Sequence, residues 1–359
     1  MGVREVIVVE PAPFGRGAYG CVYDGRVPDG TGHAHAVAVK HMAVPRDDLD
    51  AMVQLVREVR ALRCLSHPNL LRADGFTALT WTHIGIVTRR YARHLCRFDG
   101  TRAATRARVF QAVASGLSHL HAHGCVHCDV KPQNIFLSSD AEECVLGDFG
   151  MLQPAAADEA RKQAPYIVTS WYRAPELAFP SSGRYGDAVD IWSLGCVLAE
   201  MILGEALFPV SAEVSLAARH RAAFALPCFD DYALLVGVRT GQAFATWFDQ
   251  RLDDVVDREG CTHDERKWLL RTLAFDATER ATASQLAAAR EPGDAVAGDR
   301  ICGAADSDVS WQRLNDELAA ILAATPAYEL VKAAGDAATA GDAAGKPLPR
   351  ASRGWLWFL

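Results

Sequence analysis

The sequence predicts an α+β protein in which a small strand-rich lobe precedes a larger, mainly helical lobe. Up to about residue 90, apolar and polar side chains alternate, and turn signals such as Pro28-Asp-Gly-Thr-Gly32 separate the runs, as in β-hairpins. Beyond about residue 93, apolar residues recur at the three- and four-residue steps of helices. With 50% hydrophobic and 23% charged residues, the chain has the composition of a globular protein with a real core.

One helix is expected to interrupt the strands, over residues 47–65. Its buried stripe would consist of Met52, Leu55, Val56, Val59 and Leu62. Two helices are expected in the second lobe, over 105–123 and 187–203. The long segment between them holds two short apolar runs, 134–137 and 144–146, that are typical of paired strands. Long irregular segments of this kind are usually functional.

We expect three parts: a lobe of residues 1–90, a lobe of residues 91–291 and an appendage of residues 292–359. The appendage is rich in Ala, Gly and Asp. Its amphipathic stretch 311–322 predicts one helix, and the Ala/Gly-rich run 333–345 is interpreted as a flexible tail. The last residues, 355–359, are apolar, and we expect them to dock either on the body of the protein or on a partner; the sequence leaves both open.

Charge and composition exclude several classes of protein. The formal net charge of -7 gives no positive field of the kind that nucleic-acid binders use. No apolar stretch reaches the roughly 18 residues of a membrane-spanning helix, and the first residues do not fit a signal peptide. The 10 cysteines are irregularly spaced, which favours reduced thiols and an intracellular location, in cytoplasm or nucleus. Cys125 and Cys128 fit C-x-x-C, but further zinc ligands are not nearby, so a metal site of this type is not expected.

A glycine-rich run lies near the start of the chain. Gly15, Gly17, Gly20 and Val22 form the pattern G-x-G-x-x-G-x-V. Glycines let backbone N–H groups approach phosphate oxygens where a Cβ would clash. A dinucleotide-binding turn has the same glycines but opens a helix. Here a further strand and a turn follow, so the run is interpreted as a hairpin that covers phosphates.

Lys40 ends the apolar strand that starts at Val37. Alternation places Ala38 and Lys40 on one face of this strand and Val37 and Val39 on the other. An ammonium group that binds phosphates has to be held in place, and Glu58 on the predicted helix is its natural counter-ion. On its own, a strand lysine is more often a residue that faces solvent.

Further motifs follow in a fixed order along the chain. They are His127-Cys-Asp129 with Asn134, Asp148-Phe-Gly150, Ala174-Pro-Glu176, Asp190-Ile-Trp-Ser-Leu-Gly195 and, last, Arg280. Together with the glycine run and Lys40, they resemble the eukaryotic-type serine/threonine protein kinase superfamily over roughly Val6 to Arg290. The resemblance implies the bilobal protein kinase fold. The stretch from Trp171 to Arg173 is similar to the cyclin-dependent, mitogen-activated and glycogen-synthase kinase group.

The resemblance also assigns roles in phosphoryl transfer from ATP. It implies that Lys40 holds the α- and β-phosphates and that Glu58 orients Lys40. Asn134 and Asp148 would hold Mg²⁺ ions that bridge the phosphates, and Asp129 would accept or orient the proton of the substrate hydroxyl. Taken singly, each of these residues is more often a turn, cap or solvated residue, and it is their joint presence that favours the catalytic interpretation.

The same resemblance outlines an adenine pocket. Thr88 falls at the gatekeeper position, and Tyr91 belongs to the connector whose backbone would bind the base. Val22 and Ala38 would cover the ring from above and Leu137 from below, which makes an apolar slot with a few polar anchors.

Four positions bear on the acceptor and on regulation. In Lys131 and Thr169 the chain is similar to the serine/threonine branch, and Lys131 would also offset charge that develops on the γ-phosphate. Tyr166 falls where several relatives carry a regulatory phosphotyrosine, and Arg173 is a candidate partner for that phosphate. A preference for proline after the target residue is left open.

Two features bear on control and stability. Cys128 stands where most of the family has an arginine, and a thiol cannot form a bidentate pair with phosphate. We therefore expect activity to depend less on phosphorylation of the activation segment than in arginine-bearing relatives. Glu176 and Arg280 resemble the buried ion pair that links the activation segment to a late helix.

Three functions are compatible with these motifs. The leading one is an active kinase that uses ATP and Mg²⁺ on protein substrates. A pseudokinase or scaffold that binds partners through the same fold is the alternative, and its usual mark, the loss of Lys40, Asp129 or Asp148, is missing. A small-molecule phosphotransferase is the third. Gly147 before Asp148 gives a distant likeness to kinases of large DNA viruses, which would place the protein in a host cell.

Overall fold

The computed structural model describes the chain in two compact units. It covers residues 4–8, 12–17, 20–28, 33–45, 47–80, 83–95, 102–155, 170–178, 186–208, 250–287, 311–323 and 328–332. One unit, here the sheet unit, comprises Met1–Asp47, Ala73–Arg90 and Leu322–Leu359. The other, here the helical unit, comprises Asp48–Arg72 and Tyr91–Ile321.

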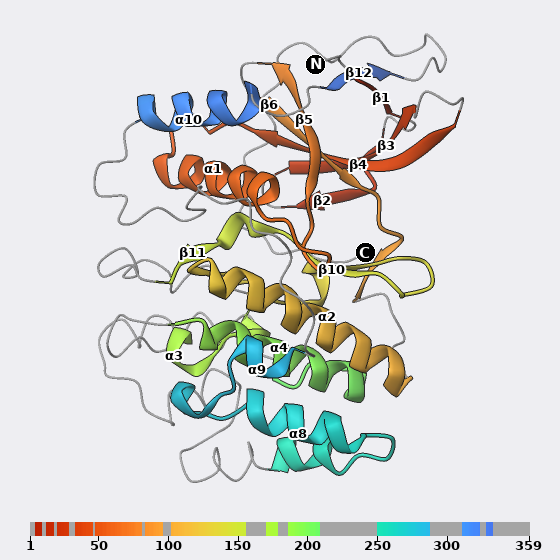
Figure 1. Cartoon of the computed structure of the whole chain (residues 1–359), viewed down its shortest axis with the longest axis vertical. Coiled ribbons are helices and arrows are strands. Elements are labelled where there is room, and N and C mark those ends of the chain that lie inside the picture. The colour runs from red at the N-terminus through yellow and green to blue at the C-terminus, as the bar shows by residue number, and fades with distance from the viewer. Residues whose placement is uncertain are drawn as a thin grey trace. The chain divides into compact units, whose positions relative to one another are not determined.

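The sheet unit is built on one 7-stranded sheet (Figure 1). Its strands are β1 (Arg4–Val8), β2 (Gly15–Gly17), β3 (Gly20–Pro28), β4 (Ala34–Ala43), β5 (Ala73–Thr80), β6 (His83–Arg89) and β12 (Tyr328–Lys332). They are ordered β12-β1-β3-β4-β6-β5, and β2 pairs with β3. The predicted strand-rich first lobe is thereby confirmed, and so is the hairpin interpretation of the glycine run, because Gly15 lies opposite Val22 across β2 and β3.

Alternation along the central strands places successive side chains on opposite faces of the sheet. Val27, Val37, Val39 and Val87 are fully buried and form one apolar cluster. Lys40 follows Val39 and therefore lies on the opposite face, as the alternation predicted. These four valines are thus buried on one side of the sheet, and Lys40 lies on the other side, opposite the buried Ile86 of β6.

Strand β12 was not expected from the sequence. It runs parallel to β1, with Arg4 opposite Tyr328 and Val8 opposite Lys332. The predicted tail, 333–345, lies outside the described residues. The appendage therefore supplies a strand to the sheet immediately before that tail.

The helical unit contains the remaining described elements. Its α-helices are α1 (Leu49–Cys64), α2 (Ala103–Ala122), α3 (Pro175–Ala178), α4 (Ala188–Leu203), α8 (His263–Thr272), α9 (Ala283–Leu286) and α10 (Trp311–Ala323). Its strands are β7 (Arg93–His94), β8 (Cys125–Val126), β9 (Ile135–Leu137), β10 (Cys144–Leu146) and β11 (Gln153–Pro154). Its 3-10 helices are η2 (Pro132–Asn134), η3 (Phe149–Met151), η5 (Ser170–Tyr172) and η6 (Ala277–Glu279). The four predicted helices correspond to α1, α2, α4 and α10, and the two apolar runs to β9 and β10, which pair.

Helix ends follow from local sequence. The side chain of Asp48 accepts a hydrogen bond from the N–H of Ala51 at 3.0 Å and caps α1. Thr262 and Glu265 form a reciprocal capping box at the start of α8. The carboxylate of Glu265 also forms an ion pair with the buried Arg106 of α2, at 2.7 Å. Glu265 therefore both caps the start of α8 and joins α8 to α2. Burial raises the pKa of Glu265, but the hydrogen bonds from Arg106 and Thr262 outweigh it and hold that pKa below its usual range.

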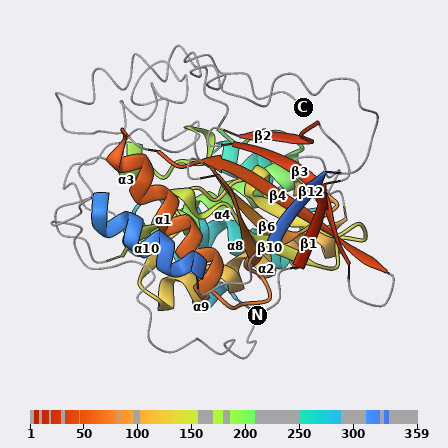
Figure 2. The same ribbon diagram turned by 90° about the horizontal axis from the view of Figure 1, so that it is seen from above.

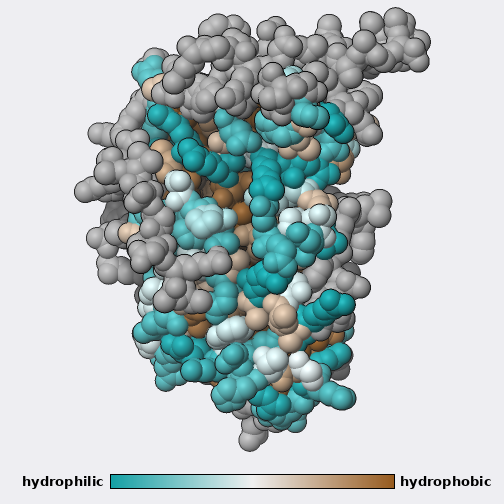
Figure 3. Space-filling view, turned by 45° about the vertical axis from the view of Figure 1, so that its right-hand side comes forward, coloured by the Kyte–Doolittle hydropathy of each residue, from teal (hydrophilic) through white to brown (hydrophobic). Residues whose placement is uncertain are grey.

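On one face of the protein (Figure 3), the described surface is mostly polar. On the face shown in Figure 3, most of the described side chains are hydrophilic, and hydrophobic ones show mainly in recesses among them. None of the described helices is both long and apolar enough to cross a membrane.

His119 predicts a pH dependence of stability. Its ring lies 5.1 Å from the ring of His67 and 4.4 Å from that of His123. Burial first, then the charges of His123 and His67, lower the pKa of His119 from 6.5 to about 4. The unfolded chain takes up this proton near pH 6.5 and the folded chain only near pH 4. The protonation of His119 therefore does not lower the free energy of unfolding above pH 6.5, but lowers it progressively as the pH drops toward 4.

We expect His119→Gln to flatten this profile. Urea unfolding at pH 7.0 and pH 4.5 would measure how much free energy of unfolding each protein loses on acidification. The loss should be smaller in the variant by on the order of 2 kcal/mol. Equal losses in the two proteins would contradict the assignment.

Candidate active site

A loop of the helical unit gathers two of the predicted residues, Lys131 and Asn134, around the carboxylate of a third, Asp129. Lys131 Nζ lies 2.7 Å from Asp129 Oδ2. Asn134 Nδ2 donates to Asp129 Oδ2 at 2.9 Å and to the carbonyl of Asp129 at 2.8 Å. Asp129 Oδ1 is buried and has no hydrogen-bond partner among the described residues. One oxygen of Asp129 is thus held by two donors, and the other remains able to accept a proton.

The electrostatics of this carboxylate fit that task. Burial raises the pKa of Asp129 above its usual range, and the nearby charge of Asp148 adds to the rise, whereas Lys131 and His127 oppose it. A carboxylate that is poorly solvated is a stronger base than one in water.

The loop is fixed from behind by Asp190 of α4. Its carboxylate accepts the N–H groups of His127 and Cys128, each at 2.8 Å, and lies 2.8 Å from His121 Nε2. Cys128 has φ 64 and Asp148 has φ 62, the left-handed region that non-glycine residues rarely adopt. Such strained residues persist only where their surroundings hold them, and the Asp190 carboxylate does so for Cys128. The sequence had indicated the motif of Asp190, but not its pairing with His121.

The predicted metal residue Asp148 lies beside Glu58 of α1. A Cβ added to Gly150 would stand 3.6 Å from Asp148 Oδ1 and 3.6 Å from Glu58 Oε2. The two carboxylates therefore flank a space that a glycine leaves open. Phe149 next to them is fully buried, with its ring 5.6 Å from the ring of His127.

The donor set fits Mg²⁺. Asn134 donates the N–H groups of its side-chain amide to Asp129, which leaves the side-chain oxygen Oδ1 as a ligand. Asp148 supplies a carboxylate. Among the described residues no group of three His, Cys, Asp or Glu side chains could hold a metal by itself. Mg²⁺ commonly takes one or two protein oxygens and completes its shell with phosphates and waters, so two protein ligands suffice.

The sheet unit presents a second group of predicted residues on one face. Ala38 lies opposite Thr88 across β4 and β6, and Lys40 lies opposite Val22 across β4 and β3. Residues directly opposite each other share a face, as do residues two apart on a strand. Val22, Ala38, Lys40 and Thr88 therefore project from the same side of the sheet, which an adenine ring and its phosphates could cover.

The glycines of the run differ in what a side chain at their positions would meet. A Cβ on Gly20 would collide with the carbonyl oxygen of His41 on β4, so glycine is required there by strand packing. A Cβ on Gly15 would meet only the side chain of Val22 at ordinary distance, 3.7 Å. Gly17 lies opposite Gly20 at the end of the hairpin. The phosphate-binding reason predicted for all three is thus not needed to explain Gly20.

A cluster at the end of β6 was missed by the sequence reasoning. Arg90 forms an ion pair with Asp24 of β3, and its guanidinium lies 4.0 Å from the centre of the Phe14 ring. Phe14 directly precedes Gly15, and its N–H donates to Val22 at 3.0 Å. Arg90 thus ties the connector after β6 to the base of the glycine hairpin. Only a contact between distant segments reveals this, so no local pattern could have indicated it.

Tyr91 and Leu137 are brought together in the helical unit. The N–H of Ala92 donates to the carbonyl of Leu137 at 3.0 Å, and the ring of Tyr91 lies 6.3 Å from that of Phe136. Lys40 and Thr88 belong to the sheet unit, and Glu58 and Tyr91 to the helical unit. The expected Lys40–Glu58 pair and the joint adenine pocket therefore stay predictions.

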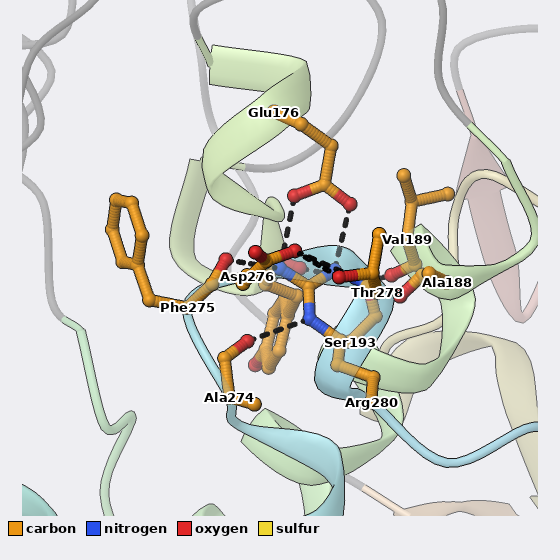
Figure 4. A network of polar contacts seen from close by, with 10 residues as sticks. Glu176, Ala188, Val189, Ser193, Ala274, Phe275, Asp276, Thr278 and Arg280 are labelled. Carbon is orange, nitrogen blue, oxygen red and sulfur yellow. Dashed lines mark hydrogen bonds and ion pairs between the residues drawn. The ribbon is translucent and has the colours of Figure 1, made fainter.

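The Glu176–Arg280 pair is present and bidentate (Figure 4). Arg280 Nη1 and Nη2 lie 2.6 and 2.9 Å from the two carboxylate oxygens of Glu176. The same guanidinium donates to the carbonyls of Ala274, Phe275 and Ala188, at 2.8, 3.0 and 3.0 Å. Every part of the cation is therefore used to join α3, α4 and the segment after α8.

The regulatory residues are only partly described. Arg173 is buried at the end of the activation segment. Tyr166 and Thr169 lie outside the described residues. The expectations for these two residues, and for Cys128 in activation, stay predictions.

Comparison with known proteins agrees with these motifs. The sequence profile of the protein kinase domain matches residues 9–290. Cyclin-dependent kinase 4 of Mus musculus is 32% identical over 288 residues, which are 76% of this chain and 91% of that protein. Cyclin-dependent kinase-like 1 of Caenorhabditis elegans is 34% identical over 205 residues, 56% of each chain. Cyclin-dependent kinase-like 4 of Mus musculus is 31% identical over 210 residues, 56% of this chain and 58% of that protein.

The extent of these matches decides what they show. The chain spans little more than half the length of the two kinase-like relatives, but nearly all of cyclin-dependent kinase 4. The profile covers most of the chain and includes both the glycine run and Arg280. The chain therefore belongs to the eukaryotic-type protein kinase superfamily and is related to its cyclin-dependent kinases.

Proposed function

We propose that the chain is an active serine/threonine kinase that transfers the γ-phosphoryl group of Mg-ATP to hydroxyl groups of proteins. The observation that carries the proposal is the state of Asp129. It is a buried carboxylate with one oxygen held by Lys131 and Asn134 and the other oxygen without a partner among the described residues. Burying a carboxylate oxygen without a hydrogen-bond partner is unfavourable for folding, and a scaffold would have no need for it.

Each group then has a task that its position supports. Asp129 Oδ1 orients the acceptor hydroxyl and takes its proton late in a loose transition state. Lys131 stays beside this carboxylate and offsets charge on the transferred group. Asn134 and Asp148 supply the oxygens for Mg²⁺, which when bound neutralises charge on the phosphates. On the sheet unit, Lys40 binds phosphate oxygens.

A radiolabel assay tests the proposal. The purified full chain is incubated with γ-labelled ATP, Mg²⁺ and a panel of protein substrates, and the labelled products undergo phosphoamino-acid analysis. Label on serine and threonine is expected, and it should be lost in Lys40→Met. Lys40→Arg serves as the matched variant that retains the charge. Label only on tyrosine, or undiminished label in Lys40→Met, would refute the proposal.

Partners and location follow as proposals. The relatives are named for dependence on a cyclin, so a cyclin-like protein is one candidate partner for this chain. Protein substrates are the second class. We expect an intracellular location because the 10 cysteines are irregularly spaced along the sequence, a pattern that favours reduced thiols.

Arg90 gives a prediction for nucleotide binding. Arg90→Ala removes both the ion pair to Asp24 and the contact with the Phe14 ring, each worth up to about 1 kcal/mol at exposed sites. We expect the KM for ATP to rise about three- to tenfold, while kcat changes little because no reacting group is touched. Steady-state kinetics at varied ATP measure both constants. A fall in kcat with an unchanged KM would contradict the assignment.

A further inference from the structure

Helix α10 of the appendage lies beside α1 within the helical unit, in both views of the ribbon (Figures 1 and 2). Glu317 of α10 forms an ion pair with Arg60 of α1, and the two side chains are only 26% and 22% exposed. A pair that is this well covered is weakly screened by solvent. The two helices are therefore joined by a specific contact.

The face of α10 that meets α1 can be identified from its burial. Leu314, Leu318 and Ile321 are 6%, 6% and 5% exposed. Glu317 follows Leu314 by three residues and precedes Ile321 by four, so all four side chains lie along one face of the helix. Because Glu317 reaches Arg60, the part of this mainly apolar face that carries Glu317 contacts α1.

The contact reaches α1 from behind its functional side. Residues two apart on a helix point about 200° apart, so Arg60 and Glu58 lie on nearly opposite sides of α1. Glu58 is buried, with its carboxylate close to Gly150 after Asp148. On the same helix, Arg57 donates to Gln153 Oε1 at 3.1 Å. Arg57 is three residues before Arg60 and therefore lies near it on α1, so α10 and the segment after Asp148 contact neighbouring positions of the helix, while Glu58 lies on the opposite side from Arg60.

We propose that α10 is a built-in positioning element that fixes α1, and with it Glu58, for phosphoryl transfer. Glu317 is a positioning residue in this proposal, because it acts through Arg60 and not on any reacting group. The kinetic part rests on the proposed kinase function, whereas the coupling of the two helices does not. The chain would then need no separate protein to hold this side of α1.

A charge-reversal cycle on the full chain tests the proposal. The variants are Glu317→Arg, Arg60→Glu and the double variant with both changes. Glu142→Arg is the matched control, since it breaks the ion pair of Arg108 and Glu142, whose side chains are 37% and 61% exposed. Hydrogen exchange of the amides in residues 49–64 reports the order of α1, and kcat and the KM for ATP report catalysis.

We expect each single reversal to speed amide exchange in α1 about tenfold and to lower kcat about tenfold, with the KM for ATP changed less than about threefold. The double variant should recover both readouts to within about threefold of the original protein, and the control should change neither. Unchanged exchange in the single variants, or no recovery in the double variant, overturns the coupling of the helices.

The two parts of the proposal fail differently. Faster exchange with an unchanged kcat overturns the positioning role while the helix contact stands. A chain without any phosphate transfer overturns the kinetic part together with the proposed function, and the exchange measurements still decide whether α10 orders α1.

Discussion

Asp129→Asn is expected to lower kcat by a factor of about 10² to 10⁴, the usual contribution of a positioned acid–base group. Asparagine has nearly the same shape, but its amide cannot accept the proton of the substrate hydroxyl. Nucleotide binding does not use Oδ1, so the KM for ATP should stay within about threefold. Initial rates with labelled ATP and a protein substrate measure both constants.

The fold should survive this change. Burial raises the pKa of Asp129, which means that the folded protein tolerates the neutral form better than the charged one. Removal of the charge therefore should not lower the free energy of unfolding. Asp140→Asn is the matched control, because Asp140 is exposed and accepts hydrogen bonds from Ser138 and Glu142 within its own turn. A kcat above about a tenth of the original in Asp129→Asn would contradict the role given to this residue.

Arg280→Met is expected to lower the free energy of unfolding by about 3 to 5 kcal/mol. The side chain of Arg280 is 0% exposed, and its removal leaves the carboxylate of Glu176 and three backbone carbonyls without their donor. Buried acceptors that lose their partner bear a desolvation cost that no new contact repays. Urea unfolding of the full chain at pH 7 measures the change.

Glu176→Gln provides the contrast on the same pair. Glu176 is 22% exposed, and Arg280 keeps its three carbonyl acceptors when the carboxylate is lost, so about 1 to 3 kcal/mol is expected. Asp257→Asn breaks the exposed pair with Arg266 and should cost less than about 1 kcal/mol. Equal costs for Arg280→Met and Asp257→Asn would show that the network does not stabilise the fold.

Most of the fold could be predicted because its signals are local. The stripe of α1 and the alternation around Lys40 each arise within one element, and the periodicity of a segment can be read without knowledge of its neighbours. Strand β12 could not be predicted, because it has five residues and its partner β1 lies at the other end of the chain. Pairing between distant segments leaves no mark on either segment alone.

The site divides in the same way. Asp129, Asn134 and Asp148 were predicted by residue type and spacing, since the chemistry fixes both. Arg90 and His121 were not, because an arginine after a strand and a histidine near a helix end are ordinary residues until their partners are known. Their roles depend on contacts across long stretches of chain, with Asp24 in one case and Asp190 in the other.

Strand β12 has a practical consequence for any shortened form of the protein. The backbone of residues 4–8 pairs with β12 along its whole length, and Ile7 and Val8 also pair with β3 on the other side. A chain cut before Tyr328 would leave a row of open N–H and C=O groups along that edge, and such edges invite other molecules to add a strand. Self-association should therefore begin when a C-terminal deletion removes Lys332 and the residues before it, and light scattering across a deletion series would locate that boundary.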